Sequence, residues 1–125
     1  GYIWNRPIFT GMVRKSRYTI DILENSDNFT VSIPLSKKLN HELMICGSKS
    51  GRDINKFKEC NLTIKKSKKV DTPIIALCDL FYECRIVYKQ EMDPKLLLND
   101  IVKSSYEKGD YHILYYGEIL ETYIK

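Results

Sequence analysis

Residues 46–57 read Cys-Gly-Ser-Lys-Ser-Gly-Arg-Asp-Ile-Asn-Lys-Phe, with two glycines, two serines and three cations. Gly47 and Gly51 permit backbone angles that other residues avoid. We expect Asp53 to cap a helix that begins at Ile54, with Lys56 in the first turn near the positive helix end. Such a glycine-rich turn with a lysine nearby suits a phosphate group. The GxxxxGK[ST] spacing of a P-loop is absent, so a plain capped turn also fits the stretch.

A second group of hydroxyls and cations lies at residues 14–19, Arg-Lys-Ser-Arg-Tyr-Thr, between an apolar segment and an amphipathic one. Two such groups in a small domain can converge on one phosphate-bearing ligand. The predicted binding residues come from both groups: Arg14, Ser16, Arg17, Thr19, Cys46, Gly47, Ser48, Ser50, Gly51, Asp53 and Lys56.

Short apolar runs, several of them alternating with polar residues, predict most of the chain to be β-strand. The expected strands cover residues 7–13, 29–33, 62–64, 70–77, 81–90 and 112–124. Gly117 falls inside the last of them, where a glycine often marks a bulge or a close approach of two backbones.

Helical periodicity predicts four short helices, over residues 18–24, 36–46, 53–60 and from Met92-Asp93-Pro94 onward, with Gly47 ending the second. Three of them have an expected buried face, formed by Tyr18, Ile22 and Leu23, by Leu39, Leu43 and Met44, and by Leu96, Leu97, Ile101 and Val102. Because strands outnumber helices and no regular βαβ alternation or GxGxxG motif occurs, a Rossmann fold is excluded. We expect a mainly β (α+β) fold, an antiparallel barrel with peripheral helices, as one domain over residues 1–125.

The net charge of +4 is mild and compatible with anionic ligands. The clearest basic run, residues 65–69, has no interleaved aromatic residue, which favours a solvated turn over a nucleic-acid patch. No apolar run approaches the roughly 20 residues that span a bilayer, and no signal segment opens the chain. We therefore expect a cytoplasmic protein with no membrane and no nucleic-acid partner.

The cysteines are Cys46, Cys60, Cys78 and Cys84, and no CxxC pair occurs, which excludes zinc-ribbon and thioredoxin sites. Cys78 and Cys84 lie in apolar contexts and are expected in the core. Cys46 lies beside the glycine-rich turn, where it is either a reactive thiol or a small residue that fits.

Few side chains offer acid–base or metal chemistry. His112 is the one candidate base near a motif, while His41 is expected on an exposed helix face. No Ser/His/Asp order and no His/Glu cluster with metal spacing is present, so no metal site is expected.

Taken together, the motifs resemble the flavin reductase-like family of FMN-binding split barrels, which includes flavoredoxin. The resemblance rests on RxSRxT at 14–19, Phe29-Thr30-Val31, CGxxSGRDxxKF at 46–57, Tyr82-Glu83-Cys84 and residues 112–119. It implies a Greek-key split β-barrel, FMN as cofactor, NADH or NADPH as co-substrate, and a homodimer with flavin at the subunit interface. It also implies that His112 lies near the flavin or the nicotinamide; the alternative is a strand-end histidine bonded to backbone. Members of the family usually carry a strand before the position of Gly1, so the chain is expected to lack that strand.

The resemblance implies an oxidoreductase that moves electrons from NAD(P)H to flavin and on to oxygen, ferric iron or a partner protein. In such proteins the flavin carries the chemistry, and the protein binds and orients the reactants. One alternative is an FMN electron carrier of the flavoredoxin type, reduced by a separate reductase. A second is a small nucleic-acid-binding barrel that uses residues 65–69. Flavin absorbance separates the last from the first two, and anaerobic bleaching by reduced nicotinamide separates those two from each other.

Overall fold

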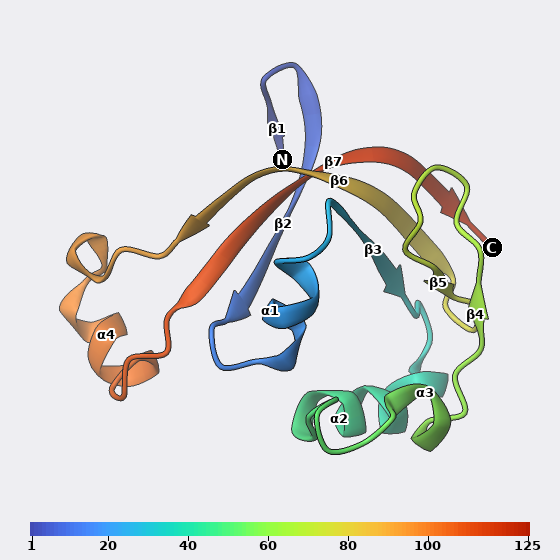
Figure 1. Cartoon of the computed structure of the whole chain (residues 1–125), viewed down its shortest axis with the longest axis horizontal. Helices are drawn as coiled ribbons and strands as arrows, with labels where there is room; N and C mark the ends of the chain where they lie inside the picture. Colours follow the sequence, from blue (N-terminus) through green and yellow to red (C-terminus); the bar gives the residue numbers. More distant parts are fainter.

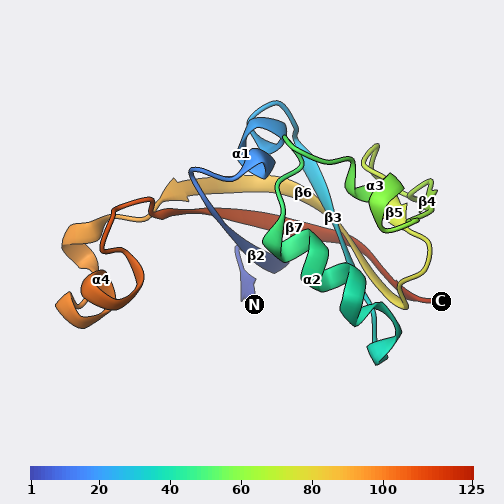
Figure 2. The ribbon, with the colours of Figure 1, turned by 90° about the horizontal axis from the view of Figure 1, so that it is seen from below.

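The computed structural model describes residues 1–125, and its centre is one antiparallel sheet of five strands. Their spatial order is β1-β2-β7-β6-β3, with β1 and β3 at the two edges. The long strands β6 and β7 run along the molecule (Figures 1 and 2). The strands are β1 (Tyr2–Ile3), β2 (Arg6–Arg14), β3 (Asn28–Ile33), β6 (Leu80–Glu91) and β7 (His112–Ile124). The predicted mainly β, antiparallel class is confirmed.

Short helices and one small ribbon connect these strands. Figure 1 shows α2 and α3 side by side below β3, while α4 lies beyond the far end of β6 and β7. The helical segments are α1 (Tyr18–Leu23), η1 (Lys37–Leu39), α2 (Asn40–Ser48), α3 (Lys56–Glu59), η2 (Pro94–Leu96) and α4 (Asn99–Ser105). The ribbon pairs β4 (Ile64–Lys65) with β5 (Ile74–Ile75), so the strands predicted at 62–64 and 70–77 shrink to two residues each.

Helix α1 is fixed on the sheet by an apolar cluster. Ile20 is buried against Ile113 and Tyr115 of β7, and Leu23 packs at the edge of this cluster. The expected burial of Tyr18 and Ile22 is wrong, because both side chains are exposed. The helix buries the pair Ile20 and Leu23, one turn apart, and thereby leaves Tyr18 and Ile22 on its free face.

The other predicted helix faces are also more exposed than expected. In α2 both Leu43 and Met44 are exposed, and only Leu39, in the preceding η1, joins a buried cluster. Of the face predicted near α4, Leu96 and Ile101 are exposed, with Leu96 81% accessible, whereas Leu97 and Val102 are half-buried. Figure 1 shows α2 below β3 and α4 beyond the far end of β6 and β7, so neither helix is stacked on the centre of the sheet. Gly47 also lies inside α2, which ends one residue later at Ser48.

The predicted core cysteines are confirmed, because Cys78 and Cys84 are buried. At Gly117 the register of β6 against β7 shifts between Ile86 and Tyr88, as predicted for a bulge, and the close approach is to side chains and not to a second backbone. A Cβ atom at Gly117 would lie 2.5 Å from Cζ of Phe29 and 2.7 Å from Cβ of Cys84. Neither neighbour is the free end of a flexible chain, so the sheet has room only for hydrogen at this position.

Gly117→Ala is therefore expected to lower the free energy of unfolding by about 1–3 kcal/mol, because the added methyl group overpacks the sheet. The control is Gly11→Ala in β2, where an added Cβ atom meets nothing within 4 Å. Urea unfolding of both variants measures the difference. Equal losses of stability in the two variants would contradict the close approach.

Candidate functional site

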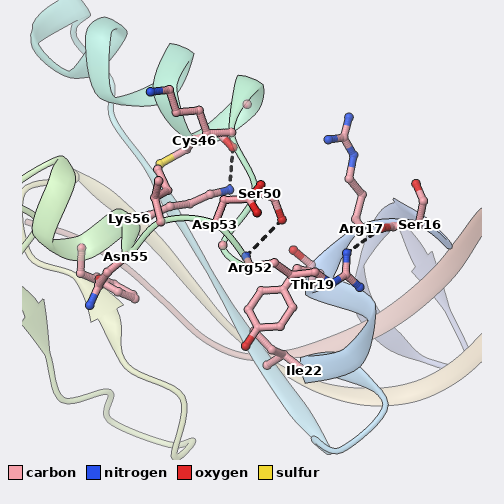
Figure 3. A pocket seen from close by; sticks show the side chains of 16 residues that line it. Ser16, Arg17, Thr19, Ile22, Cys46, Ser50, Arg52, Asp53, Asn55 and Lys56 are labelled. Carbon is pink, nitrogen blue, oxygen red and sulfur yellow. Dashed lines mark hydrogen bonds between the residues drawn. The ribbon is translucent and has the colours of Figure 1, made fainter.

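A cleft of about 920 Å³ separates the start of α1 from the segment that joins α2 to α3 (Figure 3). The two sequence motifs form its walls, although they lie about thirty residues apart in the chain. Of the predicted binding residues, all except Arg14 and Ser48 line it: Ser16, Arg17, Thr19, Cys46, Gly47, Ser50, Gly51, Asp53 and Lys56. The expected convergence of the two motifs is thus a feature of the fold.

Arg52 joins the two walls. Its Nη1 donates to the carbonyl oxygen of Ser16 at 3.0 Å, and its Nη2 pairs with the Asp21 carboxylate at 2.8 Å (Figure 3 draws the first bond). The guanidinium also lies over the Tyr18 ring, 5.3 Å from its centroid. That ring packs on Gly51, where a Cβ atom would come within 2.8 Å of Cδ1. Gly51 therefore lets the loop approach α1 closely enough for Arg52 to reach it.

The turn before α3 differs from the prediction. The carbonyl oxygen of Ser50 accepts bonds from the backbone N–H groups of Asp53 and Ile54, so this segment is a turn. Helix α3 begins at Lys56, and Asn55 is its N-cap, accepting from the backbone N–H of Lys58 at 3.2 Å. The capping role predicted for Asp53 is wrong, because the chain has not yet entered the helix at that position. Asp53 instead stands at the cleft as an exposed carboxylate.

Two cations of the cleft have different surroundings. Lys56 Nζ donates to the carbonyl oxygen of Cys46 at 2.7 Å, which ties α3 to the end of α2. Arg17, the N-cap residue of α1, takes part in none of the ion pairs of the chain. The guanidinium of Arg17 therefore has its full hydrogen-bonding capacity for an anion.

Arg14 and Ser48 lie outside the cleft. Arg14, at the end of β2, donates to the carbonyl oxygens of Asp110 and Ser105 and lies 5.1 Å over the Tyr106 ring. Arg14 pairs with His112 of β7, so its side chain stabilises the contact between the sheet and the end of α4. The Ser48 hydroxyl is 3.4 Å from the carbonyl oxygen of Ile45, inside its own helix.

Ser16 lines the cleft, but its hydroxyl is already engaged. The hydroxyl donates to the Asp110 carboxylate at 2.7 Å, and the backbone N–H of Ser16 donates to it at 2.9 Å. The hydroxyl bond is the main cause that lowers the pKa of Asp110, against the effect of partial burial. Ser16 is therefore a link between α1 and the turn before β7.

His112 does not line the cleft. It pairs with Arg14 across the sheet, and its Nδ1 is 2.6 Å from the Tyr106 hydroxyl. Burial, with the nearby Arg14 charge, lowers the pKa of His112, so the ring is neutral at pH 7. Its position beside the flavin or nicotinamide stays a prediction.

Several residues of the cleft were not among the predicted binding residues. Arg52 belongs to the motif at 46–57, but nothing in the sequence indicates that its side chain bridges the two walls. Tyr18 and Ile22 were expected on the buried face of a helix. The full set is Tyr18, Ile22, Lys49, Arg52, Ile54, Asn55 and Phe57. No group of His, Cys, Asp or Glu side chains in the chain is arranged to hold a metal ion, and none of the helices has the length and apolarity needed to cross a bilayer.

Comparisons of the sequence and of the structure with known proteins identify relatives of one kind. A family model described as "Flavin reductase like domain" matches residues 4–125. An uncharacterized protein of Archaeoglobus fulgidus is 33% identical over 107 residues, covering 86% of this chain and 50% of the relative. The crystal structure of flavoredoxin from Methanosarcina acetivorans has a TM-score of 0.73 at 24% identity, covering 97% of this chain and 54% of that one. A Shewanella frigidimarina structure described as a flavin reductase with a split barrel domain has a TM-score of 0.72 at 16% identity, covering 97% and 53%. The split-barrel architecture is therefore confirmed, and the chain spans about half the length of these relatives.

Proposed function

The chain belongs to the flavin reductase-like domain family, and from this we propose that it binds FMN in the cleft between residues 14–19 and 46–57. The observation that carries the proposal is the convergence of the two hydroxyl- and cation-bearing motifs on one cleft, joined by Arg52. We propose that the FMN phosphate is bound by cleft residues of both walls, Arg17 and Thr19 on one wall and Lys56 on the other.

These side chains have the chemistry that a phosphate group requires. Arg17 and Lys56 supply charged donors, and Thr19 and Ser50 supply hydroxyls. Charge-assisted hydrogen bonds to phosphate oxygens are shorter and roughly twice as strong as neutral ones. Apolar side chains of the same cleft, such as Ile22 and Phe57, are available to the uncharged parts of the ligand.

We further propose a flavin-dependent redox function. A bound flavin supplies hydride and electron transfer, while the protein residues bind and orient the reactants. As a flavin reductase, the protein would use NADH or NADPH and pass electrons to oxygen, ferric iron or a partner protein. As an electron carrier, it would receive electrons from a separate reductase.

A flavin titration followed by an anaerobic reduction tests these proposals. Addition of the protein to FMN is expected to change the flavin fluorescence saturably, with one FMN per chain. Anaerobic NADH or NADPH then bleaches the bound flavin of a reductase and leaves that of a carrier oxidised. Absence of saturable binding, together with binding of single-stranded DNA, would favour the nucleic-acid alternative through residues 65–69.

Arg52→Met is expected to weaken FMN binding about tenfold, or roughly 1.4 kcal/mol, because the loop loses its bonds to Ser16 and Asp21. Stability should change by less than about 1 kcal/mol, since the ion pair is exposed. Lys58→Met is the matched control, because Lys58 carries the same charge on α3 outside the cleft. Equal loss of FMN affinity in both variants would show that net charge, and not the link between the walls, matters.

We also propose a homodimer. Met12, Tyr88 and Tyr116 lie on one face of the sheet, where Met12 and Tyr88 are exposed and Tyr116 is half-buried. Trp4 packs on this surface beside Tyr88 and Tyr116, with ring centroids about 6 Å apart. A second copy would bury it. Sedimentation velocity is expected to show a dimer whose flavin content falls on dilution; a monomer with full flavin content would contradict this.

A further inference from the structure

The cysteines of the chain differ in accessibility. All four are free, and Cys60, Cys78 and Cys84 are buried. Cys46 is the exception, because it is only partly buried and lines the cleft. Figure 3 shows its sulfur on the side of α2 that faces Lys56. A reagent in solution therefore reaches Cys46 before the other three.

Two hydrogen bonds join α2 to the segment from Lys56 to Cys60. Lys56 Nζ contacts the carbonyl oxygen of Cys46 at 2.7 Å, and Cys60 Sγ contacts that of Glu42 at 3.9 Å. Cys46 follows Glu42 by one helical turn, so in α2 the Glu42 carbonyl oxygen is also the acceptor of the Cys46 backbone N–H. The Cys60 thiol therefore lies beside the backbone of Cys46, within reach of its side chain.

The chemistry of Cys60 supports this pairing. Burial is the main cause that raises the pKa of Cys60, followed by the neighbouring Cys46 thiol. The negative charges of Glu42 and Glu59 act in the same direction. One carboxylate oxygen of Glu42 is buried without any hydrogen-bond partner. Cys60 is therefore a protonated, shielded thiol, so Cys46 is expected to react first with a disulfide in solution.

We propose that Cys46 is a site of thiol–disulfide exchange with small-molecule disulfides, and that Cys60 is its resolving thiol. The Cys46 thiolate attacks one sulfur of oxidised glutathione, breaks its S–S bond and releases one glutathione thiolate. Cys60 then loses its proton to solvent and attacks Sγ of Cys46, which releases the second glutathione thiolate. The two protein thiols are oxidised by two electrons, and one oxidised glutathione becomes two reduced molecules.

The Cys46–Cys60 disulfide would close a loop that contains most of one wall of the cleft, residues 47–57. A disulfide restricts the conformations of the loop that it closes. The cleft would thus be held in one shape under oxidising conditions. This inference goes beyond flavin binding, and a protein that fails to bind FMN can still form the disulfide.

The experiment treats the folded full chain with oxidised glutathione, quenches with acid and maps the peptides by mass spectrometry. In the wild type we expect a Cys46–Cys60 disulfide, with Cys78 and Cys84 unmodified. Cys60→Ser is expected to retain one glutathione on Cys46, whereas Cys46→Ser is expected to take up none at Cys60. Cys60→Ala replaces the serine variant if circular dichroism shows that the serine variant is unfolded.

The inference is overturned by any of three results. These are a wild-type protein without the Cys46–Cys60 disulfide, a Cys60 variant without an adduct at Cys46, and modification of all four cysteines at similar rates. The expected preference of Cys46 over the buried Cys78 is at least about tenfold in rate, because exposure limits thiol reactivity.

Discussion

Glu83→Gln is expected to lower the free energy of unfolding by about 3–5 kcal/mol, since each hydrogen bond to a charged group contributes about 1.5–3 kcal/mol. Glu83 lies in β6 with 0% exposure. Its carboxylate accepts the backbone N–H groups of Lys68 at 2.8 Å, Lys69 at 2.6 Å and Val70 at 3.3 Å. The Tyr123 hydroxyl also donates to it. Glutamine would turn an NH₂ group toward these donors, so donors would face one another in a buried position.

The matched control is Glu121→Gln. Glu121 pairs with Glu83 across β6 and β7, so the substitution removes a carboxylate at the same level of the sheet. A residue without a buried network is expected to change stability by less than about 0.5 kcal/mol. Urea unfolding of the two variants measures the difference, and similar losses would show that the Glu83 network contributes little.

The same network predicts a pH dependence. Burial alone would raise the pKa of Glu83, but the hydrogen bonds from Lys68, Tyr123, Lys69 and Val70 outweigh it and lower the pKa below the ordinary value of 4.5. A lowered pKa in the folded state stabilises the protein above the unfolded value, and this stability is lost as pH falls through the folded pKa.

The stability difference between wild type and Glu83→Gln should therefore be constant near neutral pH and shrink below about pH 4.5. Four other carboxylates have a lowered pKa and contribute to acid unfolding of both proteins: Glu24, Asp79, Asp110 and Glu118. Only the difference between the two proteins isolates Glu83. A difference that grows toward acid pH would contradict the sign derived above.

The Glu83 network also accounts for the basic run at 65–69. The backbone N–H groups of Lys68 and Lys69 are held by the carboxylate, and Lys68 Nζ lies 4.0 Å over the Tyr123 ring. The run is therefore an ordered turn anchored to the sheet. No sequence pattern could show this anchor, because backbone donors are the same for every residue except proline.

The long strands could be predicted because each is a run of many apolar, β-branched or aromatic residues bounded by turn signals. The strands predicted at 7–13, 81–90 and 112–124 agree with β2, β6 and β7 to within one or two residues. The helix faces could not, since α1, α2 and α4 have only about two turns each. Over so short a length, the pairs Ile20 and Leu23 or Tyr18 and Ile22 fit a buried stripe equally well.

The candidate cleft was predictable to the level of the motifs but not of each residue. Arg14 was predicted to bind the ligand because it belongs to the RxSRxT motif. In the structure it lies at the end of β2, and its side chain bonds the carbonyl oxygens of Ser105 and Asp110. Asp53 and Asn55 are both good N-cap residues, and only the turn at Ser50 decides between them. In both cases contacts between segments distant in sequence, or the local turn, determine the role of the residue, and neither can be read from the motif.

FMN is expected to bind at least about a hundredfold more tightly than riboflavin, a difference of roughly 2.8 kcal/mol. Riboflavin lacks the phosphate, so the charged donors Arg17 and Lys56 would have no anion to bind. This preference rests on the proposed position of the phosphate in the cleft. Flavin-fluorescence titrations with both ligands measure it directly.

Arg17→Glu is expected to remove most of this preference while leaving riboflavin affinity nearly unchanged. Arg17 suits the test better than Lys56, because Arg17 has no ion pair to lose whereas Lys56 also binds the carbonyl oxygen of Cys46. Lys58→Glu makes the same change of charge outside the cleft, and long-range effects are screened at physiological salt. It should therefore keep the preference for FMN.

Equal affinities of the wild type for FMN and riboflavin would contradict the proposal that the phosphate binds in this cleft. The two motifs would then be explained by their contacts alone, since Arg52 bonds Ser16 and Asp21 whether or not a ligand is present. A preserved preference in Arg17→Glu would place the phosphate nearer Lys56. Loss of the preference in Arg17→Glu, with retention in Lys58→Glu, would assign it to the start of α1, where Arg17 and Thr19 both line the cleft.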